Sequence, residues 1–441
     1  MGDDRAVEAL RALVRCATVS DRDPARTDPA AFDAALDELR RRFPLLHERL
    51  EVTRVHTHGL LLRWPGERSD HPVVLMAHLD VVPVDEEAPW RHPPFSAEVA
   101  DGAIWGRGTL DDKGALVAVC EAVERHLEAG TVPARDVWLS FGCDEEVSGT
   151  GAELAVAELA ARRVRPWFVL DEGGAVAHDA FPGVAAPVAV VGVTEKGTTA
   201  VELVAEGRGG HASTPARHGP TARLARAITR LERHPFPAST PPATLELVRR
   251  LAPHAPPALR GLMARAERLG PLLARALVAA GPEAAAMTRT TTAVTTLSGS
   301  PAPNVIASRA VAGVNVRVMP GDTVDGVVAH LRDVVGKGVE VRLLERGEPS
   351  PVSPWDDDAF ALLEATTAGL FPDAVVAPYV MMAATDARHF TRICPRVYRF
   401  APFRMTKAQR EAIHSYDEHL GVEDFLDGVR WYHALIGGLP R

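Results

Sequence analysis

The chain has 441 residues, of which 46% are hydrophobic and 24% are charged. This composition is that of an ordinary globular protein, and no stretch approaches the ~18 uninterrupted apolar residues that a membrane span requires. The 49 Lys and Arg residues are outnumbered by 58 Asp and Glu residues, which gives a formal net charge of −9. Neither nucleic acid nor a membrane is therefore an expected partner.

The first residues, MGDDRAVEALRALVRC, combine two acids with an apolar pattern of helical period. A secretory signal would instead begin with basic residues and continue with an apolar run, so we expect a cytoplasmic protein. The cysteines lie far apart and form no CxxC pair, which predicts neither a disulfide framework nor a thiolate metal site. They are Cys16, Cys120, Cys143 and Cys394.

The first third of the chain alternates short apolar runs with helical patterns. Strands are expected at 73–77, 137–141 and 167–170, because each is a short run of apolar residues. Helices are expected at 114–129 and 152–164, where apolar residues recur at spacings of three and four. This alternation predicts a mostly parallel sheet with helices on its faces.

From about residue 194 the pattern changes to a strand, a helix, two strands, a helix and a strand. This order is the split βαβ arrangement of a ferredoxin-like α+β domain. A segment rich in Ala, Leu, Arg and Pro interrupts it at about 241–286 and predicts a helical insertion. The expected elements are the alternating run TAVELVAEG (199–207) and the segments 220–232, 290–297, 310–318, 324–335 and 339–344.

After the Pro-rich stretch 349–354 the chain returns to longer helix and strand patterns. We therefore predict one α/β catalytic domain, formed by 1–193 and 348–441, with a smaller α+β domain inserted at 194–347. The fold class is a mixed, mostly parallel sheet flanked by helices, with an inserted ferredoxin-like lid.

Polar residues follow each of the three expected strands in the first third. Because ligands bind beyond the carboxyl ends of strands in an open parallel sheet, these side chains are expected to converge on one crevice. Two further acids stand just before the first of the two helices, on the same rim. The residues are His78 and Asp80, Asp144, Glu145 and Glu146, Asp171 and Glu172, and Asp111 and Asp112.

One histidine among several carboxylates favours a metal site. Imidazole and carboxylate ligands suit zinc, and one shared carboxylate allows two divalent ions to be held together. An acid at a strand end is more often a solvated loop residue or a helix cap. The metal interpretation depends on four such groups occurring at consecutive strand ends.

At this point the sequence resembles the M20 family of metallopeptidases and amidohydrolases, and most closely the carboxypeptidase S and N-acyl-amino-acid amidohydrolase branch. The similar stretches occur in the family's order between about residues 70 and 420. They are MAHLDVVPV (76–84), GRGTLDDKG (106–114), CDEEVSG (143–149), LDEGG (170–174), GRGGHASTP (207–215), PAPNVI (301–306), NVRVMPG (315–321), ATDARHF (384–390) and IHSYDEH (413–419).

The resemblance implies two Zn²⁺ ions, replaceable by Co²⁺ or Mn²⁺, that share one carboxylate and a bridging water. Asp111 would be the shared ligand. Glu146 and His414 would complete one site, and His78 and Asp171 the other. His414 enters by resemblance alone, because periodicity does not distinguish it among 17 histidines.

The resemblance also implies roles around the metals. Asp80 would orient the ring of His78 by accepting its second N–H. Glu145 matches the general base, which takes a proton from the water and delivers it to the leaving amine. His211 matches the lid histidine that stabilises the oxyanion, and in dimeric relatives this histidine comes from the partner subunit.

The substrate is expected to carry a free carboxylate. By resemblance Asn304 and Arg317 would bind this group, since a planar guanidinium can form a bidentate pair with it, and Thr385 would complete the pocket. The expected substrates are N-acyl amino acids or short peptides cut from the carboxyl end. Met381 and Met382, next to two alanines, favour an apolar acyl group. A homodimer through the lid is also expected.

Three alternatives stay open to different degrees. A dipeptidase, or a deacetylase or desuccinylase, of the same family is poorly separated by sequence, because acyl selectivity depends on loop shape. A binding module that lost turnover is disfavoured by Glu145 beside a full set of ligands. A thiol hydrolase is disfavoured because the acids next to Cys143 oppose its thiolate.

Overall fold

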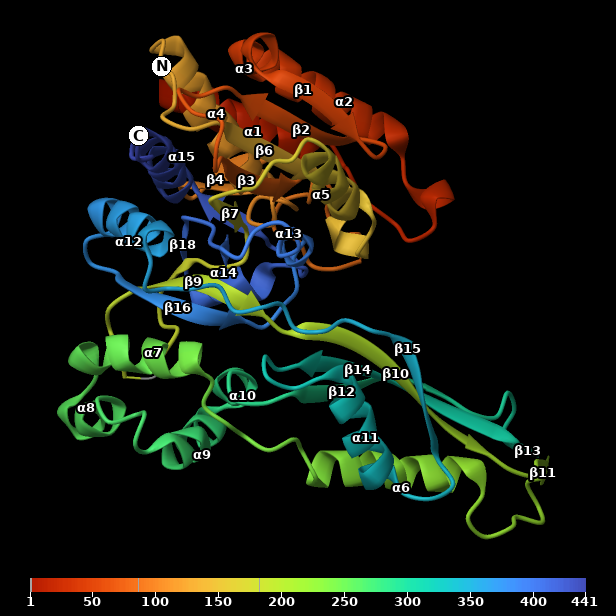
Figure 1. Ribbon diagram of the computed structural model, residues 1–441. Helices are drawn as coiled ribbons and strands as arrows, with labels where there is room; N and C mark the ends of the chain where they lie inside the picture. The colour runs from red at the N-terminus through yellow and green to blue at the C-terminus, as the bar shows by residue number, and fades with distance from the viewer. Residues whose placement is uncertain (1, 86, 182) are drawn as a thin grey trace.

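The computed structural model describes residues 2–85, 87–181 and 183–441. It consists of a large helix-covered sheet and a smaller sheet that extends from it as an arm (Figure 1). Within the described residues no helix is both long and apolar enough to cross a membrane.

The large sheet has the order β1-β2-β6-β3-β7-β17-β9-β8-β18, and β16 also pairs with β9. Its centre is parallel, because β3 pairs in parallel with both β6 and β7, and β7 does so with β17. The ten strands are β1 (Glu51–Val55), β2 (Gly59–Trp64), β3 (Val73–His78), β6 (Val137–Gly142), β7 (Phe168–Asp171), β8 (Val176–Ala177), β9 (Val188–Glu195), β16 (Val375–Met381), β17 (Val397–Arg399) and β18 (Arg404–Met405).

Helices cover both faces of this sheet, and their apolar side chains form the two clusters of its core. α4 and α15 pack against each other on one face, and α5 and α13 pack on the other. β3 is buried along its whole length, as expected for a continuous apolar run in a parallel sheet. The helices are α1 (Gly2–Arg15), α2 (Pro29–Arg42), α3 (Pro44–Arg49), α4 (Lys113–Glu128), α5 (Gly151–Ala161), α12 (Asp358–Leu370), α13 (Ala387–Phe390), α14 (Lys407–Ala412) and α15 (Val422–Gly437).

The smaller sheet has the order β12-β14-β10-β15, and α6 and α11 pack together on one face of it. Buried and half-buried residues alternate along most of β10, as in a strand with one face on a core. The elements are β10 (Gly197–Glu206), α6 (Pro220–Arg233), β12 (Thr291–Ser298), β14 (Arg309–Val318), α11 (Val324–Val335) and β15 (Glu340–Glu345). The predicted fold class, including the ferredoxin-like lid, is confirmed.

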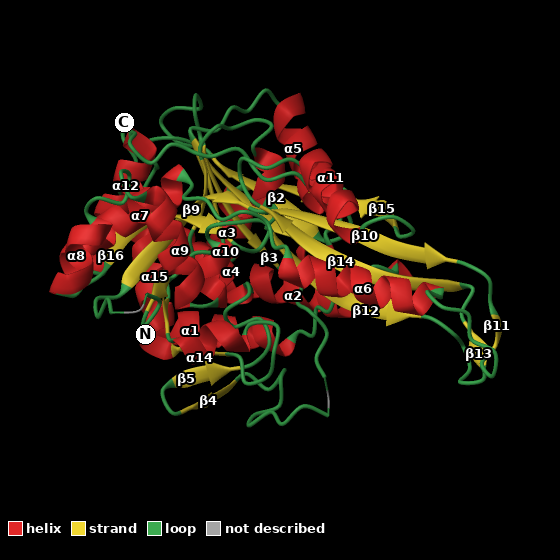
Figure 2. Cartoon of the chain, turned by 90° about the horizontal axis from the view of Figure 1, so that it is seen from below, coloured by secondary structure: helices red, strands yellow, loops and turns green. Residues whose placement is uncertain are grey.

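The lid ends in a small ribbon in which β11 (Gly210–His211) pairs with β13 (Val305–Ile306). Figure 2 shows this ribbon at the outer tip of the arm formed by β10, β12 and β14. A second small sheet, β19-β5-β4, lies on the large body. It consists of β4 (Glu98–Ala100), β5 (Ala103–Trp105) and β19 (His419–Gly421).

The predicted helical insertion is α7 (Pro242–Leu251), α8 (Pro257–Met263), α9 (Gly270–Ala280) and α10 (Pro282–Ala286), and α7 packs against β16 of the large sheet (Figure 1). Leu247 and Leu251 form one apolar cluster with Val188 and Ala377. The insertion therefore covers an edge of the catalytic sheet instead of the lid sheet.

The chain passes between the two bodies twice, and the two passages are hydrogen-bonded to each other. The amide of Ser350 donates to the carbonyl of Glu195 at 3.1 Å, and the amide of Glu195 donates to Oγ of Ser350 at 2.9 Å. Thr194 Oγ1 also donates to the carbonyl of Ser350 at 2.9 Å. The predicted domain divisions at 193/194 and 347/348 lie next to these passages and remain predictions.

Candidate active site

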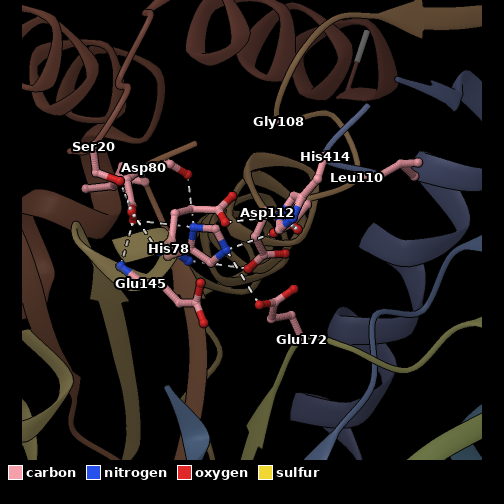
Figure 3. A network of polar contacts seen from close by, with 12 residues as sticks. Ser20, His78, Asp80, Gly108, Leu110, Asp112, Glu145, Glu172 and His414 are labelled. Carbon is pink, nitrogen blue, oxygen red and sulfur yellow. Dashed lines mark hydrogen bonds and ion pairs between the residues drawn. The ribbon is translucent and has the colours of Figure 1, made fainter. Parts of the chain in front are cut away.

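The polar residues that follow the central strands meet at one edge of the large sheet. β3 ends at His78, β7 ends at Asp171, and a short 3-10 turn, Glu145–Val147, follows β6. The loop before α4 brings Asp111 to the same edge, as Figure 3 shows for its neighbours Leu110 and Asp112. Parallel pairing of these strands places their carboxyl ends together, which explains the convergence.

Two groups of metal-ligand atoms lie at this edge. The first consists of His78, Asp111 and Glu172. Nε2 of His78 lies 2.9 Å from Oδ1 of Asp111 and 3.6 Å from Oε1 of Glu172. Nδ1 of His78 lies 3.0 Å from the carbonyl of Asp80, a contact in which Nδ1–H is the donor and Nε2 keeps its lone pair for the site (Figure 3).

The second group consists of Asp111, Glu146 and His414. Nε2 of His414 lies 3.0 Å from Oδ2 of Asp111 and 3.0 Å from Oε2 of Glu146. Each oxygen of Asp111 therefore faces a different histidine. This shared carboxylate is the geometry that two neighbouring divalent ions require.

In the structure Glu172, and not the predicted ligand Asp171, lies with His78 and Asp111. Asp171 is the last residue of β7, and its Oδ2 accepts the amide of Ala387 at 2.9 Å. Side chains alternate in direction along a strand, so the next residue, Glu172, extends toward His78. Asp171 belongs to neither ligand group of the described residues.

Asp80 is fully buried behind His78 and organises the adjoining turn. Its carboxylate accepts Oγ–H of Ser20 at 2.7 Å and the amides of Glu145 and Glu146 at 3.2 and 3.1 Å. Asp80 thus holds the imidazole through its carbonyl and, through its carboxylate, the backbone that carries the two glutamates. This arrangement is typical of the residues that orient metal ligands.

The electrostatics of the site favour a bound cation. Burial, and then the charge of Asp111, raises the pKa of Glu172 to about 8. Burial also raises the pKa of Glu145 well above its usual value. Hydrogen bonds to Asp111 and Glu146 raise the pKa of His414 to about 10. Oε1 of Glu146 is buried without a hydrogen-bond partner, so this carboxylate set fits divalent ions.

A cavity of about 280 Å³ opens beside both ligand groups. Glu145 lies in its wall, within the same turn as Glu146. Most of the remaining wall is apolar, and one guanidinium, that of Arg410, is part of it. The other lining residues are Leu110, Asp111, Glu172, Gly173, Gly174, Ala175, Met381, Ala383, Ala384, Thr385, Ala401, Met405, Ile413 and His414.

Thr385 connects the cavity wall to the first passage into the lid. Its amide and its hydroxyl donate to Oε2 of Glu195 at 3.3 and 3.2 Å. The same oxygen accepts Nε–H of the fully buried Arg399 at 3.0 Å. One carboxylate, that of Glu195, therefore contacts both the cavity wall and Arg399.

The three predicted lid residues do not reach the two ligand groups of their own chain. His211 and Asn304 are exposed on the ribbon at the outer tip of the lid, where the carbonyl of Asn304 accepts the amide of Ala212 at 3.0 Å (Figure 2). Arg317 lies on β14, where its guanidinium donates to Asn315 at 3.1 Å and Thr198 at 2.8 Å. Within one chain these residues are separate from the cavity.

The sequence interpretation missed four residues that the structure places at or next to the site. Glu172 stood in a recognised motif, but its neighbour was chosen. Arg410 stands four residues before His414, but α14 ends at Ala412, so a helical spacing does not connect the two. Glu418 stood in the quoted motif IHSYDEH but was given no role. Glu195 carries no local signal, because a buried acid looks like any other acid in a sequence.

Comparison with known proteins identifies the family of the chain. The model of Peptidase family M20/M25/M40 matches residues 74–437. The chain is 35% identical over 400 residues to the probable carboxypeptidase S-like 2 of Dictyostelium discoideum, which covers 89% of this chain and 77% of that protein. It is 36% identical over 391 residues to the N-fatty-acyl-amino acid synthase/hydrolase PM20D1 of Homo sapiens, which covers 88% and 77%.

Solved structures share the fold at low sequence identity. An M20 family metallo-carboxypeptidase from Sulfolobus solfataricus superposes with a TM-score of 0.71 at 17% identity, covering 98% of both chains. Human carnosine dipeptidase 1 gives a TM-score of 0.70 at 16% identity, covering 98% of this chain and 95% of that one. The chain belongs to the M20 family of peptidases and is a hydrolytic enzyme.

Proposed function

We propose that the protein is a two-zinc hydrolase that cleaves the amide bond of N-acyl amino acids with a free carboxylate. The observation that carries this proposal is the Asp111 carboxylate, whose two oxygens face His78 and His414 beside a largely apolar cavity. The names of the similar sequences, which include an N-fatty-acyl-amino acid synthase/hydrolase, support the substrate class.

One ion would be held by His78, Asp111 and Glu172, and the other by Asp111, Glu146 and His414. Imidazole nitrogen and carboxylate oxygen are good ligands for zinc, and Co²⁺ or Mn²⁺ would fit the same atoms. Bound zinc would lower the pKa of a water molecule and polarise the scissile carbonyl.

Glu145 is the proposed general base. It lies in the wall of the cavity, and the raised pKa of its buried carboxyl group suits a residue that accepts a proton near neutral pH. It would take the proton from the attacking water and deliver it to the leaving amine. Asp80 holds the turn that carries Glu145, because it accepts the amides of both glutamates.

We propose that His211 acts on the partner's site in a homodimer. It is exposed at the tip of the lid, and within one chain it lies away from the cavity. There it would donate to the developing oxyanion. Asn304 and Arg317 would bind the substrate carboxylate from the lid, and Thr385 would do so from the cavity wall. A cytoplasmic location remains a prediction from the sequence.

The cavity also supports an apolar acyl group. Leu110, Met381, Met405 and Ile413 contribute large apolar side chains to its wall. Burying an acyl chain against them would contribute about 0.8 kcal/mol for each methylene group removed from water. A dipeptide or a short acetyl or succinyl group would gain less from this wall.

One preparation can test metal binding and substrate class together. Elemental analysis per chain is combined with release of free amino acid from acetyl, succinyl and fatty-acyl amino acids and from dipeptides. About two zinc ions per chain and the highest kcat/KM on fatty-acyl substrates are expected. Glu145→Gln should retain the metal and lose activity by about 10²–10⁴-fold. Glu158→Gln, at a half-buried residue of α5 that pairs with Arg162, should leave activity unchanged.

A preference for dipeptides, acetyl or succinyl substrates would reject the fatty-acyl assignment within the same family. Two metals without turnover on any substrate would support a binding module. Absence of bound metal would reject the metal centre itself.

A further inference from the structure

We infer that Glu418 is a positioning residue that sets the distance between the Asp111 loop and His414. This inference rests on the proposed two-metal centre, because Asp111 and His414 are ligands of the second site. Glu418 belongs to the motif IHSYDEH, and its carboxylate oxygens are not among the candidate ligand atoms. Its role would be to hold two separate segments of the chain in register.

The Glu418 carboxylate is fully buried, and it lies against the loop that precedes α4. Three main-chain amides donate to it, those of Gly108 at 3.1 Å, Leu110 at 2.8 Å and Asp111 at 3.2 Å. Successive N–H groups that point at one centre form an anion-binding concavity. The carboxylate therefore fixes the backbone of Asp111 directly.

Arg107 joins the same loop to the segment that carries His414. Its Nη1 donates to Oε2 of Glu418 at 2.6 Å, and its Nη2 donates to the carbonyl of Ser415 at 2.5 Å. Ser415 directly follows His414 in the chain. In addition, the amide of Gly106 donates to the carbonyl of Glu418 at 2.9 Å. These bonds hold the two segments together without using either ligand side chain.

The backbone conformation of this loop at Gly108 requires a glycine. Its φ is +88°, and a Cβ atom there would lie 2.8 Å from Cγ1 of Val81, so another side chain would displace the amide that donates to Glu418. A glutamine at 418 would present N–H groups to donors, and it would leave at least one buried amide without an acceptor. Loss of the carboxylate should therefore release the loop.

The chain contains a matched control in Glu124 of α4. Glu124 is also buried, and its carboxylate accepts the amides of Leu45 and Leu46 at 3.0 and 2.8 Å. Neither amide belongs to a segment that carries a candidate ligand. Glu124→Gln thus removes the same kind of interaction with no path to the metals.

The test is a titration of chelator-treated, full-length protein with Co²⁺, followed by visible absorption and calorimetry, with thermal unfolding of each apo variant. Wild type should bind two Co²⁺ ions. Glu418→Gln should bind the ion at Glu146 and His414 about 10–100-fold more weakly, with a changed absorption spectrum. The ion at His78 and Glu172 should be weakened less, because only its shared ligand Asp111 is held by Glu418. Glu418→Asp should recover part of the affinity.

Glu124→Gln should lower thermal stability and leave both Co²⁺ affinities unchanged. Unchanged binding in Glu418→Gln, or equal weakening in Glu124→Gln, would overturn the positioning role. If Glu418→Gln does not fold, Arg107→Lys is the variant that tests the inference. Lysine keeps the positive charge but cannot donate to Glu418 and Ser415 at the same time. Weaker binding of the ion at Glu146 and His414 is expected. Wild type that binds fewer than two ions would overturn the two-metal centre and this inference with it.

Discussion

Oε1 of Glu172 lies 3.6 Å from Nε2 of His78, on the side of the imidazole that also faces Asp111. The neighbouring carboxylate of Asp171 instead accepts the amide of Ala387. The two adjacent acids therefore have different roles, one toward the metal site and one toward the backbone that leads into α13.

We predict opposite consequences for the two matched substitutions. Glu172→Gln should weaken binding of the ion at His78 by at least about tenfold and change thermal stability little, because it removes a ligand. Asp171→Asn should keep two metals per chain and lower the free energy of unfolding by about 1–3 kcal/mol, since a buried amide loses its charged acceptor. Equilibrium dialysis and urea unfolding measure the two effects, and the reverse pattern would restore Asp171 as the ligand.

A second prediction concerns the exposed His211 at the lid tip. His211→Ala should lower kcat by about 10²–10³-fold, the usual effect of removing one oxyanion donor. If the partner supplies this histidine, a 1:1 mixture of His211→Ala and Glu145→Gln subunits should recover about one quarter of wild-type activity. Half of the dimers are then mixed, and each has one intact site.

The mixture needs evidence that subunits exchange, which native mass spectrometry of one tagged variant provides. Mixed dimers without recovered activity would show that His211 does not act across the dimer. Full activity of a monomeric wild-type protein would contradict the dimer itself.

A third prediction concerns the length of the acyl group. Met381 lies in the cavity wall, whereas its neighbour Met382 packs against the apolar core. Met381→Ala should shift the preferred acyl chain toward longer substrates, by about fourfold in kcat/KM for each additional methylene that becomes buried. Met382→Ala should lower stability and leave the preference unchanged. An identical chain-length profile in both variants would place the acyl group elsewhere.

A fourth prediction concerns acid stability. Burial, and then the charge of Arg388, lowers the pKa of His389 to about 4, against 6.5 in an unfolded chain. Between pH 6.5 and pH 4 the unfolded chain therefore binds a proton that the folded chain does not. The free energy of unfolding should fall as pH falls through this range.

Urea unfolding at pH 7 and pH 4.5 tests this assignment. His389→Gln should show a smaller loss of unfolding free energy between the two pH values than wild type. His254→Gln, which changes an exposed histidine, should match the wild-type loss. If His389→Gln loses as much unfolding free energy between the two pH values as wild type does, other groups cause the acid sensitivity.

The elements of the fold were largely predictable because their periodicities are strong. The helix expected at 324–335 is α11, and the strand expected at 73–77 is β3 with one more residue. The position of the insertion was also predictable, because its composition differs from that of its surroundings. Its packing on β16 was not, since an amphipathic helix does not specify which apolar surface it will cover.

The candidate site was predictable as far as strand ends could indicate it. His78, Asp111 and Glu146 follow from their places at the ends of expected elements, and His414 follows from resemblance alone. The choice between Asp171 and Glu172 depends on the residue at which β7 ends, and a shift of one residue reverses the direction of a side chain. Glu418 depends on contacts with residues about 310 positions away, which a local pattern does not record.

The two passages between the bodies meet at Glu195 and Ser350, which are hydrogen-bonded neighbours. A segment whose ends are adjacent can be lengthened, shortened or exchanged while the strands on either side keep their places.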